Sequence, residues 1–302
     1  MKTFMRLFQF IIYFVQYVLV RLAMALYTLV PASKAYTLGF RFASSIYPLF
    51  KMRNQVAIDN ILQAKITADP SKAAQIARHS FCHFIGHLLE ALKVPQVISE
   101  KNWKEHIVYD VKDVGNWNML MLNLDTPIIL LTGHLGSWEA AVTIVPFTRP
   151  MMPVARAMDN PMLVRFLKKS HFRGNVTIIS KKNGFTGDIM RTWKSTKAAL
   201  TIVMDQHAGH EGIKVDFLGR PASTHTSPAR IHLASGAPMI VGAFLREGLF
   251  KYRMIGEPPI QFTPTGNKEK DIETLLIEMN QRLGNLIRKY PEQYLWMHKR
   301  WR

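Results

Sequence analysis

The hydrophobic positions divide the chain into regions with different spacing, and the first is almost uniformly apolar. As a helix, the run from Leu7 to Val30 would be about 36 Å long, enough to cross a bilayer. Glutamines and Arg21 interrupt it, which leaves two arrangements open: a membrane-spanning helix, or one lying in a single leaflet. Because apolar side chains surround the whole helix, lipid contact is favoured, and residues 1–35 are predicted to be a membrane anchor.

From residue 51 to residue 94 the apolar positions recur every three or four residues, which predicts helices. One of them begins where Asp69 precedes a proline, a typical helix start. On that helix His79, His83 and His87 recur at four-residue intervals and would share a face. Since no carboxylate or cysteine completes a metal-binding set, we interpret them as a wet or packed face.

After residue 125 short apolar and β-branched runs alternate with helical stretches. This pattern predicts an α/β fold with a mostly parallel central sheet flanked by helices. The predicted strands cover residues 127–132, 151–155, 176–180, 199–204, 238–244 and 252–255. No internal repeat or long linker interrupts residues 36–302, which are predicted to form one domain.

The composition is that of a globular protein. The chain has 302 residues, of which 48% are hydrophobic and 20% charged, and this excludes a disordered, collagen-like or multi-spanning membrane protein. The net charge of +18 favours polyanionic partners such as nucleic acid, anionic lipid or an acidic carrier protein. The single cysteine, Cys82, excludes an intramolecular disulfide and a cysteine-based zinc site.

Candidate chemistry gathers where the predicted strands end, the edge of a parallel sheet at which functional residues collect. These ends carry His134, Arg156, a lysine pair at 181–182, and Asp205 with Gln206. The strongest local pattern is PIILLTGHLGSWEAAVTIV, in which glycines bracket the histidine and a helix follows. Asp205 has two interpretations, a functional acid or a structural acceptor for the following loop, and the second is slightly favoured.

The turn after the first strand suggests an acid–base pair. Ser137 can cap the following helix, so Glu139 lies in the first helical turn, where it can meet His134 in the preceding loop. The carboxylate would keep one imidazole nitrogen protonated and leave the other as a general base. No G-x-S-x-G motif is present, so direct attack by a substrate hydroxyl fits better than an acyl-enzyme.

Several ordered motifs resemble the bacterial lipid A biosynthesis acyltransferases, within the lysophospholipid acyltransferase superfamily. They include RNQVAIDNI, GHLGSWE, the Asp205–Gln206 pair, FLGRPASTHTSPARIHLASGAP and PEQYLWMHKRW, and the resemblance covers most of the chain. The glycerophosphate branch usually has aspartate as the acid of its histidine motif and an F-P-E-G-x-R segment, and neither occurs here. A departure from the lipid A pattern follows the Asp205–Gln206 pair, where His207 begins a segment in which another acid is usual.

The resemblance implies an inner-membrane O-acyltransferase of the lauroyl- or myristoyl-transferring type, with residues 36–302 as an acyltransferase domain on the cytoplasmic face. The donor would be acyl carrier protein or acyl-CoA, and the acceptor a glycolipid, an acylated glucosamine disaccharide bearing Kdo sugars. His134 and Glu139 would be the catalytic residues. No metal or organic cofactor is implied.

Substrate contacts are expected from residues around this pair. Backbone N–H groups near Gly136 and Ser137, or a nearby arginine, would stabilise the oxyanion. Arg156 and Arg173 would bind phosphates, and Asp205 and Gln206 would also line the substrate site. The terminal PEQYLWMHKRW segment would either bury its aromatic residues and turn its basic residues toward phosphates, or belong to the core.

Three other functions stay open: acylation of a different lysolipid or glycolipid, a catalytically inactive membrane-binding homologue, and a basic nucleic-acid-binding protein. The last is disfavoured because the chain has no helix-turn-helix, RNA-binding or zinc-finger pattern. Retention of both His134 and Glu139 argues against the inactive homologue.

Overall fold

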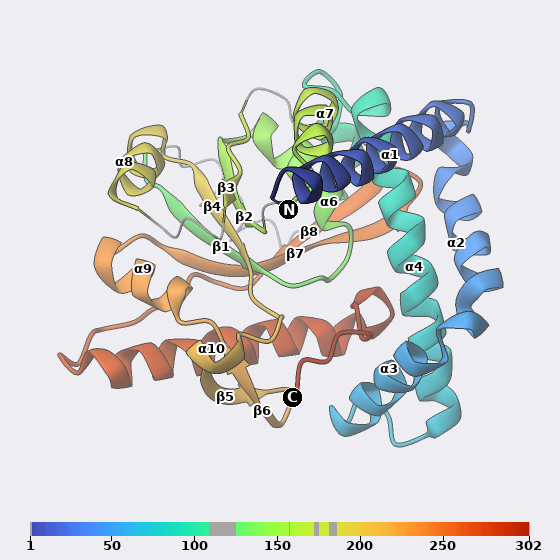
Figure 1. Ribbon diagram of the computed structural model, residues 1–302. Coiled ribbons are helices and arrows are strands. Elements are labelled where there is room, and N and C mark those ends of the chain that lie inside the picture. Colours follow the sequence, from blue (N-terminus) through green and yellow to red (C-terminus); the bar gives the residue numbers. More distant parts are fainter. Residues whose placement is uncertain (1, 109–124, 157, 172–174, 181–185, 302) are drawn as a thin grey trace.

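The computed structural model describes residues 2–108, 125–156, 158–171, 175–180 and 186–301. Its larger elements surround one twisted sheet (Figure 1). The helices are α1 (Lys2–Thr28), α2 (Ala35–Ile46), α3 (Lys51–Gln63), α4 (Pro70–Val97), α6 (Trp138–Ile144), α7 (Pro161–His171), α8 (Gly187–Thr196), α9 (Ser227–Ser235) and α10 (Lys268–Lys289). The strands are β1 (Ile128–Thr132), β2 (Met151–Ala155), β3 (Ile179–Ser180), β4 (Ala199–Val203), β5 (Ile213–Phe217), β6 (Arg220–Thr224), β7 (Met239–Gly248) and β8 (Lys251–Gly256).

The central sheet has the strand order β3-β2-β4-β1-β7-β8. Its internal pairs are parallel, and only β8 runs antiparallel, against β7. The predicted α/β class with a mostly parallel sheet is therefore confirmed. The third strand is shorter than predicted, since β3 begins at Ile179, and β7 extends to Gly248, beyond the predicted end.

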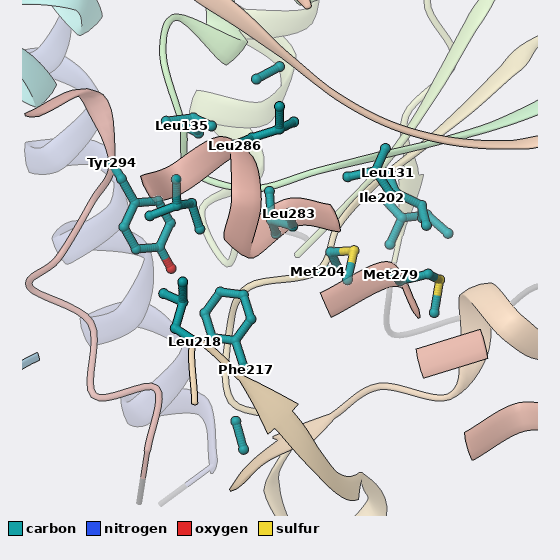
Figure 2. Close-up of a cluster of buried hydrophobic side chains, with 14 of the residues drawn as sticks. Leu131, Leu135, Ile202, Met204, Phe217, Leu218, Met279, Leu283, Leu286 and Tyr294 are labelled. Carbon is teal, nitrogen blue, oxygen red and sulfur yellow. The ribbon is translucent and has the colours of Figure 1, made fainter. Parts of the chain in front are cut away.

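Alternate residues of each central strand face opposite layers, as the two-residue period of a strand requires. Ile129 and Leu131 of β1 belong to the main core, which α10 covers, whereas Ile128 and Leu130 belong to a separate cluster beneath α6. Figure 2 shows part of the main core, where Leu283 and Leu286 of α10 lie near Leu131 and Leu135. Both faces of the sheet are thus buried, which explains why its strands are continuously apolar.

A helical layer, α2 to α4, stands beside the sheet (Figure 1). Its longest helix, α4, begins as the sequence predicts, with the Asp69 carboxylate accepting a hydrogen bond from the Ser71 N–H at 2.8 Å. Helices α2 and α4 cross closely at two glycines: a Cβ added to Gly39 would lie 3.0 Å from the Gly86 Cα. Helix α4 also contacts α6.

The apolar N-terminal helix is docked on the outside of the body, against α7 (Figure 1). Residues Phe8–Thr28 are long and apolar enough to cross a membrane, and none of that window is buried. The docking contact combines ring packing of Tyr17 against Phe166 with hydrogen bonds. The Asn160 side chain, at the start of α7, donates to the Tyr13 carbonyl at 2.8 Å and to Gln16 Oε1 at 3.2 Å. Asn160 therefore ties the middle of α1 to the protein.

A two-stranded antiparallel hairpin, β5 and β6, packs beside α10 and is not among the predicted strands. Its turn is Leu218-Gly219, and both residues have positive φ (58° and 86°). Glycine adopts such angles readily, but leucine does not, so the usual Asn-Gly or Asp-Gly signal of this turn is missing.

Most of the C-terminal segment packs into the protein. Tyr294 and Trp296 are buried, and Arg300 is buried with them, where it donates to the Ser223 carbonyl and to Thr224 Oγ1. Of the two arrangements considered for this segment, Arg300 follows the core alternative, because its guanidinium fastens the segment to β6. The segment also contacts the loop that follows β1, since the Leu295 N–H donates to the His134 carbonyl at 3.0 Å.

Candidate active site

His134 and Asp205 lie side by side because the two strands that precede them are neighbours. Strands β1 and β4 pair in parallel with Thr132 opposite Val203, and each candidate residue follows its strand by two positions. His134 Nδ1 is 2.9 Å from Asp205 Oδ1, and the backbone N–H of His134 donates to Asp205 Oδ2 at 2.8 Å. Both carboxylate oxygens of Asp205 therefore contact the same histidine, and Asp205 also forms a hydrogen bond with the Tyr294 side chain.

These contacts determine the tautomer of the neutral imidazole. Since the Asp205 carboxylate only accepts hydrogen bonds, His134 Nδ1 must carry a proton, which leaves Nε2 with its lone pair. The side-chain amide nitrogen of Gln206, a hydrogen-bond donor, lies 3.4 Å from His134 Nε2. The His134 side chain is 16% exposed, whereas Asp205 is 3% exposed, so the base is accessible and its carboxylate is shielded.

The pKa values of the two groups are shifted in opposite directions. Burial lowers the pKa of His134, but the charge and hydrogen bond of Asp205, together with the charge of Glu139, outweigh it and raise the pKa above 6.5. Burial raises the pKa of Asp205, but His134 and the more distant Arg300 outweigh that effect and lower it below 3.8. The pair is therefore suited to hold a positive imidazolium against an ionised carboxylate.

Glu139 has a different partner from the one expected. Its Oε2 is 2.8 Å from Nε2 of His87 on α4, and in the described part of the chain it makes no hydrogen bond to His134. The expected direct His134–Glu139 contact is therefore replaced by a His134–Asp205 contact. Although Glu139 lies in the first turn of α6, the buried α4 histidine binds its side chain.

The loop between β1 and α6 is held on both sides by backbone hydrogen bonds. The Gly136 N–H donates to the Gln293 carbonyl at 2.9 Å, and the Ser137 N–H donates to the Phe244 carbonyl at 2.6 Å. Gly136 has φ +74°, and a Cβ there would lie 2.3 Å from the Phe244 oxygen, so only glycine fits. Both N–H groups are occupied in this way, so neither of these two is available to an oxyanion.

Ser137 stands at the N-cap position of α6, but its side chain does not cap the helix. Within the described residues the buried Ser137 hydroxyl, Trp138 Nε1 and Glu139 Oε1 have no hydrogen-bond partner. Three consecutive residues of the motif thus offer unused polar atoms. The predicted position of the helix start is confirmed, whereas the predicted capping bond is wrong.

An apolar cavity of about 190 Å³ lies between α6 and the sheet. Its walls include Leu130, Val142, Met151 and Phe244. Trp138 also lines it, and the Trp138 ring packs edge-on against the His134 imidazole at 5.5 Å between centroids. Trp138 therefore connects the cavity wall with the candidate base.

The remaining candidate residues are less tightly organised. Arg156 is exposed just after β2, on the strand next to β4. Arg173 and the lysines at 181–182 lie outside the described residues. His83 and His87 are buried and packed on each other, and the described residues contain no group of three or more potential metal ligands.

Two curated proteins are similar to this chain. The lipid A biosynthesis palmitoleoyltransferase of Escherichia coli (strain K12) is 23% identical over 199 residues, which is 64% of this chain and 61% of that protein. A lipid A biosynthesis acyltransferase of Shigella flexneri matches with the same identity and coverage. The matched part of the chain thus spans about three fifths of the length of these relatives.

Among solved structures, the 1-acyl-sn-glycerophosphate acyltransferase of Thermotoga maritima matches 82% of this chain and 95% of its own, with 12% identity and a TM-score of 0.32. The family model for bacterial lipid A biosynthesis acyltransferases matches residues 1–302, the whole chain. This protein belongs to the bacterial lipid A biosynthesis acyltransferase family.

Proposed function

We propose that the protein transfers a fatty acyl chain from a thioester donor, acyl carrier protein or acyl-CoA, to a hydroxyl of a glucosamine-based lipid A precursor. The observation that carries this proposal is the base His134, which a buried carboxylate fixes through Nδ1 and which packs against Trp138, a residue of the apolar cavity wall. Membership of the family supports the acyl-transfer chemistry and the type of acceptor.

In the proposed reaction, His134 Nε2 takes the proton of the acceptor hydroxyl while the hydroxyl oxygen attacks the thioester carbonyl carbon. The new C–O bond forms, the C–S bond breaks, and the imidazolium returns the proton to the leaving sulfur. Asp205 stabilises the imidazolium, and the negative charge of Glu139 adds to this effect. Direct attack is favoured over an acyl-enzyme because, among the described residues, Ser137 makes no hydrogen bond to a histidine that could activate it.

The negative charge that develops on the thioester oxygen needs a donor other than the N–H groups of Gly136 and Ser137, which are occupied. Two side chains qualify: the Gln206 amide, which already lies beside His134 Nε2, and the unpartnered Ser137 hydroxyl. Arg156, at the same edge of the sheet, and Arg173 would contact phosphate groups of the substrates.

The apolar cavity suits the hydrocarbon part of the substrate. An acyl chain inside it would be surrounded by side chains of α6, β1, β2, β4 and β7, with its carbonyl end near Trp138 and His134. We propose a lauroyl or myristoyl group as the acyl chain that the protein transfers.

We also propose that residues 1–35 bind the inner membrane as an anchor and that residues 36–302, the acyltransferase domain, work on its cytoplasmic face. Phe8, Leu19 and Leu26 of α1 are at least 60% exposed, and the net charge of +18 favours anionic lipid and an acidic carrier protein. Because Asn160 ties the middle of α1 to the protein body, the helix is better placed to lie in one leaflet than to span.

The test is a matrix of acyl-transfer reactions on the purified full-length protein. Acyl carrier protein and acyl-CoA donors are each offered with a Kdo-bearing glucosamine lipid, a plain glucosamine lipid and lysophosphatidic acid, and products are measured by mass spectrometry. We expect the glucosamine acceptors to be acylated faster than lysophosphatidic acid. Equal or reversed rates would refute the acceptor assignment, and no transfer in any combination would favour the inactive membrane-binding homologue.

A further inference from the structure

His87 is a buried histidine whose two ring nitrogens both face acceptors. It is 2% exposed, on the inner face of α4. Its Nε2 is 2.8 Å from Glu139 Oε2, and its Nδ1 is 3.1 Å from the carbonyl oxygen of His83 in the preceding turn. A carbonyl oxygen cannot donate, so Nδ1 must carry a proton for that hydrogen bond to exist.

The second contact of His87 joins its Nε2 to Glu139 Oε2, and a hydrogen bond there requires a proton on one of these two atoms. An ionised carboxylate only accepts, so with Glu139 charged both nitrogens of His87 are protonated and the ring is an imidazolium. Burying an ionised carboxylate without a counter-charge is costly, and the imidazolium supplies that counter-charge.

Aromatic side chains pack around the ring of His87. Besides Glu139, its ring packs against Phe84, Trp138 and His83. Burial lowers the pKa of His83 well below 6.5, and the charges of His87, Arg246 and His79 lower it further. His83 thus stays neutral, and it uses Nδ1 for a hydrogen bond with the Tyr36 hydroxyl.

The two carboxylate oxygens of Glu139 differ in their hydrogen bonding. Oε2 is held by His87, whereas Oε1 is buried and has no donor among the described residues. Glu139 follows Trp138, which lines the cavity and packs against His134. Oε1 is therefore an available acceptor close to the proposed reaction site.

We propose that His87 is a positioning residue: a buried imidazolium that holds Glu139 by Oε2 and leaves Oε1 to accept a hydrogen bond from an O–H or N–H group of a substrate. The role in turnover rests on the acyltransferase function proposed above, whereas the protonation of His87 does not. His87 acts from α4, which contributes no other residue to the proposed chemistry.

The protonation state is tested by NMR of the full-length protein, labelled with ¹⁵N-histidine and held in detergent micelles at pH 7. The His87 signals are identified by their loss in His87→Gln. We expect both ring nitrogens of His87 to resonate in the protonated range, and Glu139→Gln to convert the ring to a neutral tautomer with Nε2 unprotonated. A neutral His87 in the wild-type protein would overturn the proposal.

The positioning role is tested by kinetics, with variants that keep or remove the donor to Glu139. His87→Leu removes the donor, and loss of such a charge-assisted hydrogen bond should lower kcat/KM about 10- to 100-fold. His87→Gln keeps an N–H at a similar position and should recover part of that loss. The double variant His87→Leu/Glu139→Gln should be no slower than Glu139→Gln, because the two residues act as a unit.

His79→Leu is the matched control, since His79 lies two turns earlier on α4 with a side chain that is 44% exposed, and it should leave turnover unchanged. Equal losses in His87→Leu and His87→Gln, or losses that multiply in the double variant, would overturn the positioning role. If the wild-type protein transfers no acyl chain, the proposed function fails while the NMR result still stands. If it is active and His87 is neutral, only the present inference fails.

Discussion

Replacing Asp205 by asparagine should disable His134 through its tautomer, although the side chain keeps its shape. The backbone N–H of His134 donates to Asp205 Oδ2 at 2.8 Å, so the amide oxygen of the variant must occupy that position. The amide NH₂ then faces His134 Nδ1, at the place now taken by Oδ1, 2.9 Å away. Nδ1 must then accept a hydrogen bond, so the imidazole proton moves to Nε2. Nε2 no longer has a free lone pair and cannot take a proton from the acceptor hydroxyl.

The expected loss has two components. The lost charge-assisted hydrogen bond to a carboxylate is worth about 1.5–3 kcal/mol, or roughly 10- to 100-fold in rate. Blocking the base removes general-base catalysis, which contributes roughly 10²- to 10⁴-fold. Because both losses fall on one proton transfer they overlap, and kcat/KM should fall by roughly 10²- to 10⁴-fold.

The assay is the initial rate of acyl transfer as a function of pH, together with a thermal melt of each protein. In the wild-type protein, activity should rise with pH through a pKa above 6.5, because the base works unprotonated and Asp205 raises the pKa of His134. In Asp205→Asn the small remaining activity should rise at a lower pH, since that raising effect is gone.

Asp271→Asn is the matched control. Asp271 is also buried, and it accepts hydrogen bonds from the Thr265 N–H at 3.1 Å and from its hydroxyl, so its replacement should lower stability in a similar way. It lies about 18 Å along α10 from Leu283, the residue that packs near Gly133, and should keep normal turnover. Near-normal activity in a folded Asp205→Asn protein would refute the tautomer argument.

Three further predictions concern the cavity, the stability and the membrane. Val142→Trp should fill the cavity and shift preference toward shorter acyl chains in a competition of lauroyl, myristoyl and palmitoleoyl donors; an unchanged preference would remove the cavity from chain selection. The raised pKa of His134 contributes stability that is complete below pH 6.5 and is lost as pH rises through the folded-state pKa, so the Tm advantage of the wild type over Asp205→Asn should shrink as the pH rises above 6.5. The lowered pKa of Asp205 contributes stability that is lost as pH falls below 3.8, and a Tm advantage that is constant across both windows would contradict the pairing. Deleting residues 1–30 should release much of the protein from membranes, and high salt should weaken what remains; a full-length protein that fractionates as soluble at low salt would refute the anchor.

Most strands could be predicted from the sequence, but their order in the sheet could not. The apolar runs located β1 and β4, yet nothing local indicates that these two are neighbours, because about 65 residues and two other strands separate them in the chain. Once the order is known, the pairing of Thr132 with Val203 places His134 beside Asp205 directly. The importance of Asp205 was therefore underestimated for a topological reason.

Glu139 shows the opposite case, because its proximity to His134 in the sequence does not bring the two side chains into contact. It lies five residues from His134, and the turn between them allows a meeting, but the choice of partner depends on α4, whose His87 is 52 residues earlier. The three histidines of α4 were recognised as one face and interpreted as wet or packed. The structure has the packed alternative for His83 and His87, and the carboxylate that approaches them comes from a distant segment.

The measurement that tests the central claim most directly is the turnover of His134→Ala beside its thermal melt. His134 Nε2 is the base on which the proposed reaction depends, and the side chain is partly exposed and not a core residue. We predict a folded, membrane-bound protein whose acyl transfer is lower by roughly 10²- to 10⁴-fold, with the donor and acceptor that serve the wild type best. Turnover near that of the wild type in a folded His134→Ala protein would contradict the account.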